Sequence, residues 1–263
     1  MNRKTIAFIA ALLMYLPAFA ALAETAEEKG LAIAVEADRR DTGFGDTSAN
    51  MTMDLRNKQG DTSTRYIRIR ILEVDGDGDK SMSVFDEPAD VKGTAFLTHS
   101  HALKPDDQWL YLPALKRVKR INSKNKSGPF MGSEFAYEDL ASQEIEKYHY
   151  KYLRDENLNG IDCFVIERTP AYEHSGYTRM VAWINKAEYR PEKIVFYDRK
   201  NDLLKTLTFS GYHKYLDRYW RADHYRMDNH QTGKSTQLTW NDYRFKTGLD
   251  DNDFNQNSLK RAK

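Results

Sequence analysis

The chain has 263 residues, of which 40 are Lys or Arg and 39 are Asp or Glu, so its formal net charge is +1. This balance argues against a nucleic-acid-binding protein, which typically carries a clear excess of basic residues. Aromatic residues make up 12% and charged residues 30% of the chain. These proportions fit strands with apolar inner faces and polar outer faces, and the length is consistent with one domain.

The N-terminus has the pattern of a secretory signal peptide. Two basic residues precede an apolar run over residues 6–19, and Ala-Leu-Ala at 21–23 forms a small-residue cleavage site. A membrane anchor is the alternative interpretation, but the apolar run is short for a span. We therefore expect residues 1–23 to be cleaved as a signal peptide and residues 24–263 to form a single exported, soluble domain.

The mature chain is predicted to begin with a helix and to continue as a β-meander. Residues 24–40 combine an apolar patch with flanking charges, which favours an amphipathic helix. From residue 51 onward apolar and polar residues alternate, as in half-buried strands. The strands predicted in the second half of the chain are 148–153, 161–167, 178–184, 193–197, 203–209, 221–227 and 236–240. About ten strands or more predict a closed or strongly curled sheet, because flat open sheets of that size are uncommon.

The alternation places one set of apolar side chains on the same face of the predicted sheet. The members of this set are Met51, Met53, Leu55, Ile67, Ile69, Ile71, Met82 and Val84. Few helices are available to cover that face, so either side chains fill the curled interior or a cavity remains for an apolar ligand. Periodicity alone favours a filled core, whereas the flexible methionines are suited to variable apolar partners.

Motifs for metal binding or catalysis are weak. His99 and His101 share a strand face, but the sequence places no third ligand beside them. Residues 75–79 have the D-x-D-x-D spacing of a calcium loop, yet Lys80 stands where that loop needs Gly, so a hairpin turn is expected. Cys163 lies in an apolar strand and is expected to be a buried, inert thiol. We therefore predict a protein without enzymatic activity, metal or cofactor.

Segment 109–140 carries the most specific pattern in the chain. It runs from Tyr-Leu-Pro-Ala at 111–114 through basic residues at 116–121 to Phe-Met-Gly-Ser at 130–133 and Tyr-Glu-Asp-Leu at 137–140. This succession resembles the outer-membrane lipoprotein-sorting-like family, relatives of the periplasmic carrier LolA. The resemblance implies a mainly β fold: a single curved antiparallel sheet that forms an unclosed β-barrel, with a few helices covering the concave face.

The resemblance also implies a function. Proteins of this family hold acyl chains on the concave face, so a periplasmic carrier or chaperone for lipid or lipoprotein is expected. The partners that the resemblance suggests are an inner-membrane exporter of the RND/MMPL type or an outer-membrane acceptor. The residues then expected to line the lipid cavity are the eight apolar residues named above together with Phe96, Trp109, Phe130 and Met131. The last three are the candidates for its mouth or gate.

The basic part of the same segment has two interpretations. Lys116, Arg117, Lys119 and Arg120 form either a solvated strand face or a contact for lipid phosphate or an anionic partner. The second interpretation leads to an alternative function: a non-enzymatic envelope protein that binds a membrane transporter through this segment and carries no lipid.

Overall fold

The computed structural model describes residues 24–262, so the predicted signal peptide lies outside the described residues. The described chain forms a single 13-stranded sheet. The strands are β1 (Asp46–Arg56), β2 (Thr62–Leu72), β3 (Lys80–Glu87), β4 (Ala95–His99), β5 (Asp107–Leu112), β6 (Arg117–Arg120), β7 (Tyr148–Leu158), β8 (Ile161–Pro170), β9 (Tyr177–Asn185), β10 (Pro191–Asp198), β11 (Leu203–Tyr215), β12 (Tyr219–Asn229) and β13 (Ser235–Phe245). Two α-helices accompany them, α1 (Ala26–Asp41) and α2 (Gln256–Arg261).

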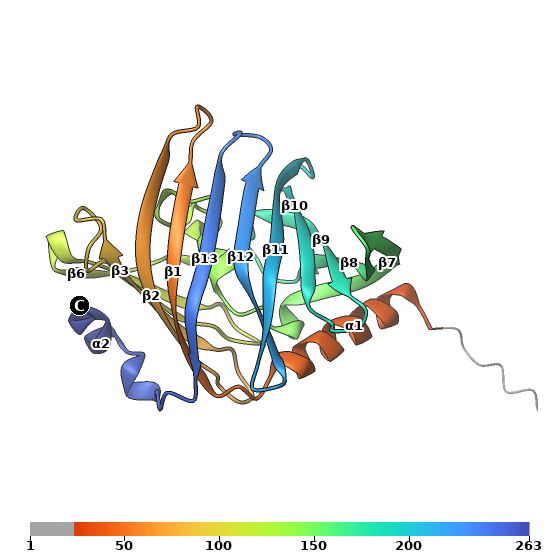
Figure 1. Cartoon of the computed structure of the whole chain (residues 1–263), viewed down its shortest axis with the longest axis horizontal. Coiled ribbons are helices and arrows are strands. Elements are labelled where there is room, and N and C mark those ends of the chain that lie inside the picture. Colours follow the sequence, from red (N-terminus) through yellow and green to blue (C-terminus); the bar gives the residue numbers. More distant parts are fainter. Residues whose placement is uncertain (1–23, 263) are drawn as a thin grey trace, which may run out of the picture.

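The sheet consists of two meanders joined in the middle. The strand order is β6-β5-β4-β3-β2-β1-β13-β12-β11-β10-β9-β8-β7, so the first and last strands pair with each other. Every pairing is antiparallel, and the sheet curves strongly without closing, with β6 and β7 as its two edges (Figure 1). This confirms the predicted mainly β fold, an unclosed barrel made from one curved antiparallel sheet.

Helix α1 lies across one end of the strands (Figure 1) and confirms the helix predicted over 24–40. It begins with a capping box, in which the Thr25 hydroxyl accepts from the Glu28 amide and the Glu28 carboxylate accepts from the Thr25 amide. The helix packs so closely on β7 that a Cβ placed on Gly30 would lie 2.6 Å from the Tyr152 backbone nitrogen. Only glycine permits this approach. No helix within residues 24–262 is long and apolar enough to cross a bilayer.

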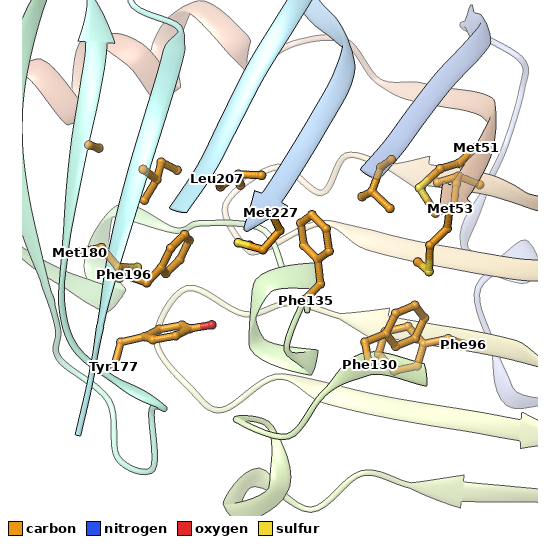
Figure 2. Packing of buried hydrophobic residues seen from close by; sticks show 14 of the residues in the cluster. Met51, Met53, Phe96, Phe130, Phe135, Tyr177, Met180, Phe196, Leu207 and Met227 are labelled. Carbon is orange, nitrogen blue, oxygen red and sulfur yellow. The ribbon is translucent and has the colours of Figure 1, made fainter. Parts of the chain in front are cut away.

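The concave side is occupied largely by the chain between the two edge strands. We call residues 121–147, which connect β6 to β7, the inner segment. This segment holds four short 3-10 turns, among them Tyr137–Leu140. Figure 2 shows Phe130 and Phe135 of the inner segment within the cluster of buried side chains that the strands supply. The Phe130 ring lies 5.1 Å from that of Phe96.

The register of β3 corrects the prediction that all eight apolar residues share one face. Val84 lies opposite Arg68, and Met82 lies opposite Arg70. Because residues directly opposite in an antiparallel pair project to the same face, Met82 and Val84 lie on the outer face with the arginines. Phe85, which is fully buried opposite Ile67, takes the inner position.

The outer face carries a second core. Met82, Val84 and Leu97 pack there against Phe254 and Leu259. The C-terminal turn and α2 thus cover part of the convex face (Figure 1). Trp109, which lies opposite Leu97, joins this outer cluster and contacts His99 edge to face at 5.1 Å.

Candidate functional site

The concave side is filled over one part and hollow over another. A cavity of about 1190 Å³ opens at the end of the sheet where α1 lies. The apolar part of its strand wall is formed by Ile71, Ile166, Ile184, Ile194 and Phe209. These residues come from β2, β8, β9, β10 and β11, so only the curvature of the sheet brings them together. The volume lies above the range of roughly 300–1,000 Å³ typical of small-molecule sites.

The remaining walls are charged. They are formed by the second half of α1, the end of the inner segment, the turns between β2 and β3, between β9 and β10 and between β11 and β12, and charged side chains of β8, β11 and β12. The acidic lining residues are Asp38, Asp41, Glu73, Asp75, Asp77, Asp79, Glu144, Glu146, Glu188 and Asp217. The basic ones are Arg39, Arg40, Arg168, Arg190, Lys214, Arg218 and Arg221. A ligand that fits this cavity therefore has an apolar part and at least one polar end.

Several of these carboxylates are close enough to perturb one another. Burial raises the pKa of Asp79 to about 7, and repulsion from Glu144, Glu73 and Asp41 acts in the same direction. Burial likewise raises the pKa of Glu144 and of Asp38. Part of this acidic cluster is therefore protonated near neutral pH.

We expect Asp79→Asn to raise the free energy of unfolding at pH 8 by on the order of 2 kcal/mol. The pKa of Asp79 is raised in the folded state, so the unfolded chain loses its proton first as pH rises from about 4. Wild-type stability therefore falls between pH 4 and about 7, whereas the asparagine variant lacks this fall. Urea unfolding between pH 4 and pH 8 measures both curves. Asp75→Asn, at an exposed turn position, is the control, and an equal response of the two variants would contradict the assignment.

The basic side chains of the cavity differ in how they are paired. Arg221 pairs with Asp41, and Arg190 lies 3.2 Å from a Glu192 oxygen while its guanidinium stacks on Tyr212 at 4.0 Å. Arg168 instead donates to the amide oxygen of Gln143, and its Nε and Nη2 have no partner among residues 24–262.

The inner segment is anchored to the sheet by a buried ion pair and by buried hydrogen bonds. The Lys205 ammonium donates to Asp139 at 2.7 Å and to the Glu134 carbonyl at 2.9 Å. The Tyr177 hydroxyl donates to the other Asp139 oxygen at 2.7 Å. The side chains of Lys205 and Asp139 are only 4% and 9% exposed, so water competes little for these bonds. The segment is a fixed part of the interior and forms one wall of the cavity.

Most of the predicted cavity residues lie in the filled part. Met51, Met53, Ile67, Ile69 and Phe96 are all buried in the inner cluster (Figure 2 labels three of them). Of the twelve predicted residues, Ile71 lines the large cavity. Leu55 lines a smaller hollow of about 230 Å³ next to Gly132 and Thr236. The lipid-binding role of the filled positions stays a prediction.

The predicted gate is wrong for two of its three residues. Phe130 is 1% exposed and lies in the core, and Trp109 packs on the outer face. Met131 is half-buried against the inner cluster, and its carbonyl accepts a hydrogen bond from Arg65. The physical reason for Phe130 is a tight turn over Phe130–Gly132, in which Met131 and Gly132 have positive φ, so that the Phe130 side chain enters the core.

Sequence reasoning missed the wall from β8 to β11. Its strands were predicted, but alternation alone does not show which of the two faces of each strand is concave. The four basic residues lie at one edge of the sheet, and their contact with an anionic partner stays a prediction. Arg117, Lys119 and Arg120 are exposed on the edge strand β6, and Lys116 is exposed just before it. Arg117 and Lys119 lie on one face of the strand, and Arg120 lies on the other. Arg120 also pairs with Asp107.

The remaining candidates for chemistry have structural partners. His99 shares a hydrogen bond of 2.7 Å with the Phe254 carbonyl, and His101 lies 2.8 Å from Asp77 and 3.3 Å from Asp107. Residues 24–262 contain no group of three side chains that could hold a metal ion. Cys163 is fully buried, and burial raises the pKa of its thiol to about 11, as expected for an inert cysteine.

The fold and cavity define an open β-barrel whose concave side is partly filled by its own chain. A domain from Vibrio parahaemolyticus whose name assigns it to outer membrane lipoprotein sorting is 63% identical, with a TM-score of 0.88 over 89% of this chain and 100% of that one. A DUF1329 family protein from Desulfovibrio piger is 32% identical, with a TM-score of 0.85 over 89% and 99% of the two chains. A LolA superfamily protein from Nitrosomonas europaea, 22% identical, shares the fold with a TM-score of 0.70 over 87% and 98%.

A family described as "Uncharacterized protein" matches residues 77–261. A search of curated proteins finds no match. The chain belongs to the outer-membrane lipoprotein-sorting-like family and has the fold of the LolA superfamily.

Proposed function

We propose that the protein is a periplasmic carrier that shields the acyl chains of a lipid or lipoprotein in the cavity beside α1. The observation that carries the proposal is the 1190 Å³ hollow with an apolar strand wall. Its place within a family named for lipoprotein sorting supports the same function. The predicted signal peptide supports the periplasmic location.

Carrying a lipid in this way needs no bond chemistry. Each methylene transferred from water to the apolar wall contributes about 0.8 kcal/mol. Because the inner segment is anchored, we expect loading and release at the open end near α1, with little movement of the filled part. Delivery then requires an acceptor that binds the cargo better than the cavity does.

Co-purification tests this function. The protein is exported in its native host, purified without detergent and extracted with organic solvent, and the extract is analysed by mass spectrometry. We expect a lipid or acylated peptide in near-stoichiometric amount. A second sample, delipidated by unfolding and refolding, shows whether the same species rebinds. An extract without lipid, from protein that also binds none after delipidation, would contradict the proposal.

We propose the basic edge strand β6 as the contact with an exporter of the RND/MMPL type. The observation that favours it is that β6 ends the sheet, with unpaired backbone groups and exposed Arg117 and Lys119. If this contact is all that the protein provides, it is a transporter-binding protein without lipid cargo, which remains the second candidate.

We expect the double variant Arg117→Glu/Lys119→Glu to lose capture of the exporter from native-host membranes while its stability changes by less than about 0.5 kcal/mol. The reason is that both side chains are exposed, so that reversal alters the surface field alone. The matched control is Lys200→Glu/Lys234→Glu, in exposed turns. Equal capture by both double variants would remove β6 as the contact.

A further inference from the structure

Arg168 is the buried cation of the cavity whose charge the described residues leave least satisfied. It lies on the inner face of β8, two residues after the wall residue Ile166, with Tyr150 opposite on β7. Only 9% of the residue is exposed. An arginine in that position normally has a carboxylate partner, because an unpaired buried charge is strongly unfavourable.

The partners of Arg168 are few and neutral. One guanidinium nitrogen, Nη1, donates to the Gln143 amide, while Nε and Nη2 donate to no residue in 24–262. The guanidinium also lies 5.7 Å from the centre of the Tyr148 ring. The planar Arg168 guanidinium has five N–H donors, but its only partners are one amide oxygen and one aromatic ring among the described residues.

Carboxylates are available nearby but are used elsewhere. Glu144 follows Gln143 directly in the chain, yet it accepts a hydrogen bond from the Ser142 hydroxyl. Other cavity arginines do pair: Arg221 with Asp41 and Arg40 with Glu36. The missing partner of Arg168 is therefore a local arrangement and does not reflect a shortage of acids.

We propose that Arg168 binds the anionic head group of an amphiphile, a carboxylate or a phosphate, whose alkyl chain lies along the apolar wall of the cavity. The inference rests on the carrier function proposed above and specifies its cargo. Gln143 is exposed, so it is free to turn away and yield its place to an anion. A carboxylate or phosphate accepts more strongly than an amide and matches the fork in a bidentate manner.

Two neighbours support the same ligand. Tyr150 lines the cavity, and its hydroxyl makes no hydrogen bond to other described residues. Burial raises its pKa, so it is a neutral donor at physiological pH and suits an anionic oxygen. Ile166 and Ile145 begin the apolar surface beside it. A fatty acid and a phospholipid each carry an anionic head group, whereas the ester- and amide-linked acyl anchor of a lipoprotein carries none, so this site favours a fatty acid or phospholipid over a lipoprotein.

The acidic cluster in the same cavity sets a condition on binding. Asp38, Asp79 and Glu144 repel a free anion, even though their raised pKa values reduce that repulsion. We therefore expect recognition to require the alkyl chain as well as the head group, and inorganic phosphate alone to bind weakly.

Calorimetric titration of the delipidated protein at pH 7.5 tests the proposal with probes of one chain length. Dodecanoate and dodecyl phosphate are the anionic probes, 1-dodecanoylglycerol is the neutral probe and inorganic phosphate lacks a chain. We expect at least one anionic probe to bind roughly tenfold or more tightly than the neutral probe. The two anionic arms distinguish a carboxylate from a phosphate head group.

Variants then assign the preference to Arg168. Arg168→Met is expected to abolish it while changing the affinity for 1-dodecanoylglycerol by less than about threefold. Arg244→Met removes an equal charge from an exposed position on β13 that does not line the cavity, and it is expected to keep the preference. Gln143→Ala removes the competing acceptor and is expected to tighten dodecanoate binding severalfold. Thermal unfolding establishes that each variant is folded.

The outcomes separate this inference from the carrier function. Equal affinity for charged and neutral probes, or a preference that survives Arg168→Met, overturns the inference and leaves the carrier function standing. Weaker dodecanoate binding by folded Gln143→Ala also overturns it. Phosphate binding as tight as that of dodecyl phosphate shows a small-anion site instead. If no probe with an alkyl chain binds, both proposals fall.

Discussion

Replacing Lys205 by methionine is expected to lower the free energy of unfolding by about 3–5 kcal/mol. The substitution leaves the buried Asp139 carboxylate without its cation, and it leaves the Glu134 carbonyl without a donor. Breaking one side of a buried ion pair is costly because the remaining charge stays out of water. Methionine nearly preserves the side-chain volume, so the loss reports the charge and not a void.

Urea denaturation followed by tryptophan fluorescence measures the effect of Lys205→Met. Lys200→Met, at an exposed turn five residues earlier, is the matched control and is expected to change stability by less than about 0.5 kcal/mol. The double variant Lys205→Met/Asp139→Asn is expected to recover part of the loss, because the stranded charge is gone. A loss below about 1 kcal/mol in Lys205→Met would show that this pair does not anchor the inner segment.

Filling the cavity is expected to have the largest effect on cargo binding. Ile71→Trp places a larger ring on the strand wall, where Ile71 is half-buried and faces the hollow. We expect the variant to fold and its affinity for an alkyl-chain ligand to fall roughly tenfold or more. The reason is that the indole ring occupies space in which several methylene groups of the ligand would be buried.

Competition with a fluorescent fatty acid measures the loss of affinity in Ile71→Trp. Tyr66→Trp is the control on the same strand, since Tyr66 is 50% exposed and does not line the cavity. Unchanged affinity in a folded Ile71→Trp variant would move the binding site away from the cavity. A loss shared by Tyr66→Trp would point to a general effect of the substitutions on β2.

Local sequence predicts much of the sheet. The strands between 148 and 240 can be recognised because each alternates over several residues and ends at a turn. Helix α1 can be recognised by its apolar patch and charges. The cavity wall is different: Ile166 and Ile194 have the same alternating context as outward-facing neighbours, and nothing local marks their side as concave.

The second limit of prediction from sequence is that the inward–outward alternation of side chains can change phase across a hairpin turn. Met82 continues the alternation of Ile67, Ile69 and Ile71 only if the turn after β2 keeps the same phase. The turn instead places Met82 opposite Arg70, which moves it to the outer face. A shift of one residue exchanges the two faces of a strand, so a small error in turn length reverses a whole set of assignments.

The sequence by itself determined the mainly β architecture, the N-terminal helix, the exposed basic strand and the family, because these depend on local alternation and on a continuous motif. The tertiary structure alone decided that Phe130 fills the interior, that Trp109 lies outside and that Arg168 meets the cavity without a carboxylate partner among residues 24–262. The physical reason is that a cavity is what remains after distant strands and the inner segment have packed. Its lining depends on curvature and register, which no single stretch of sequence contains.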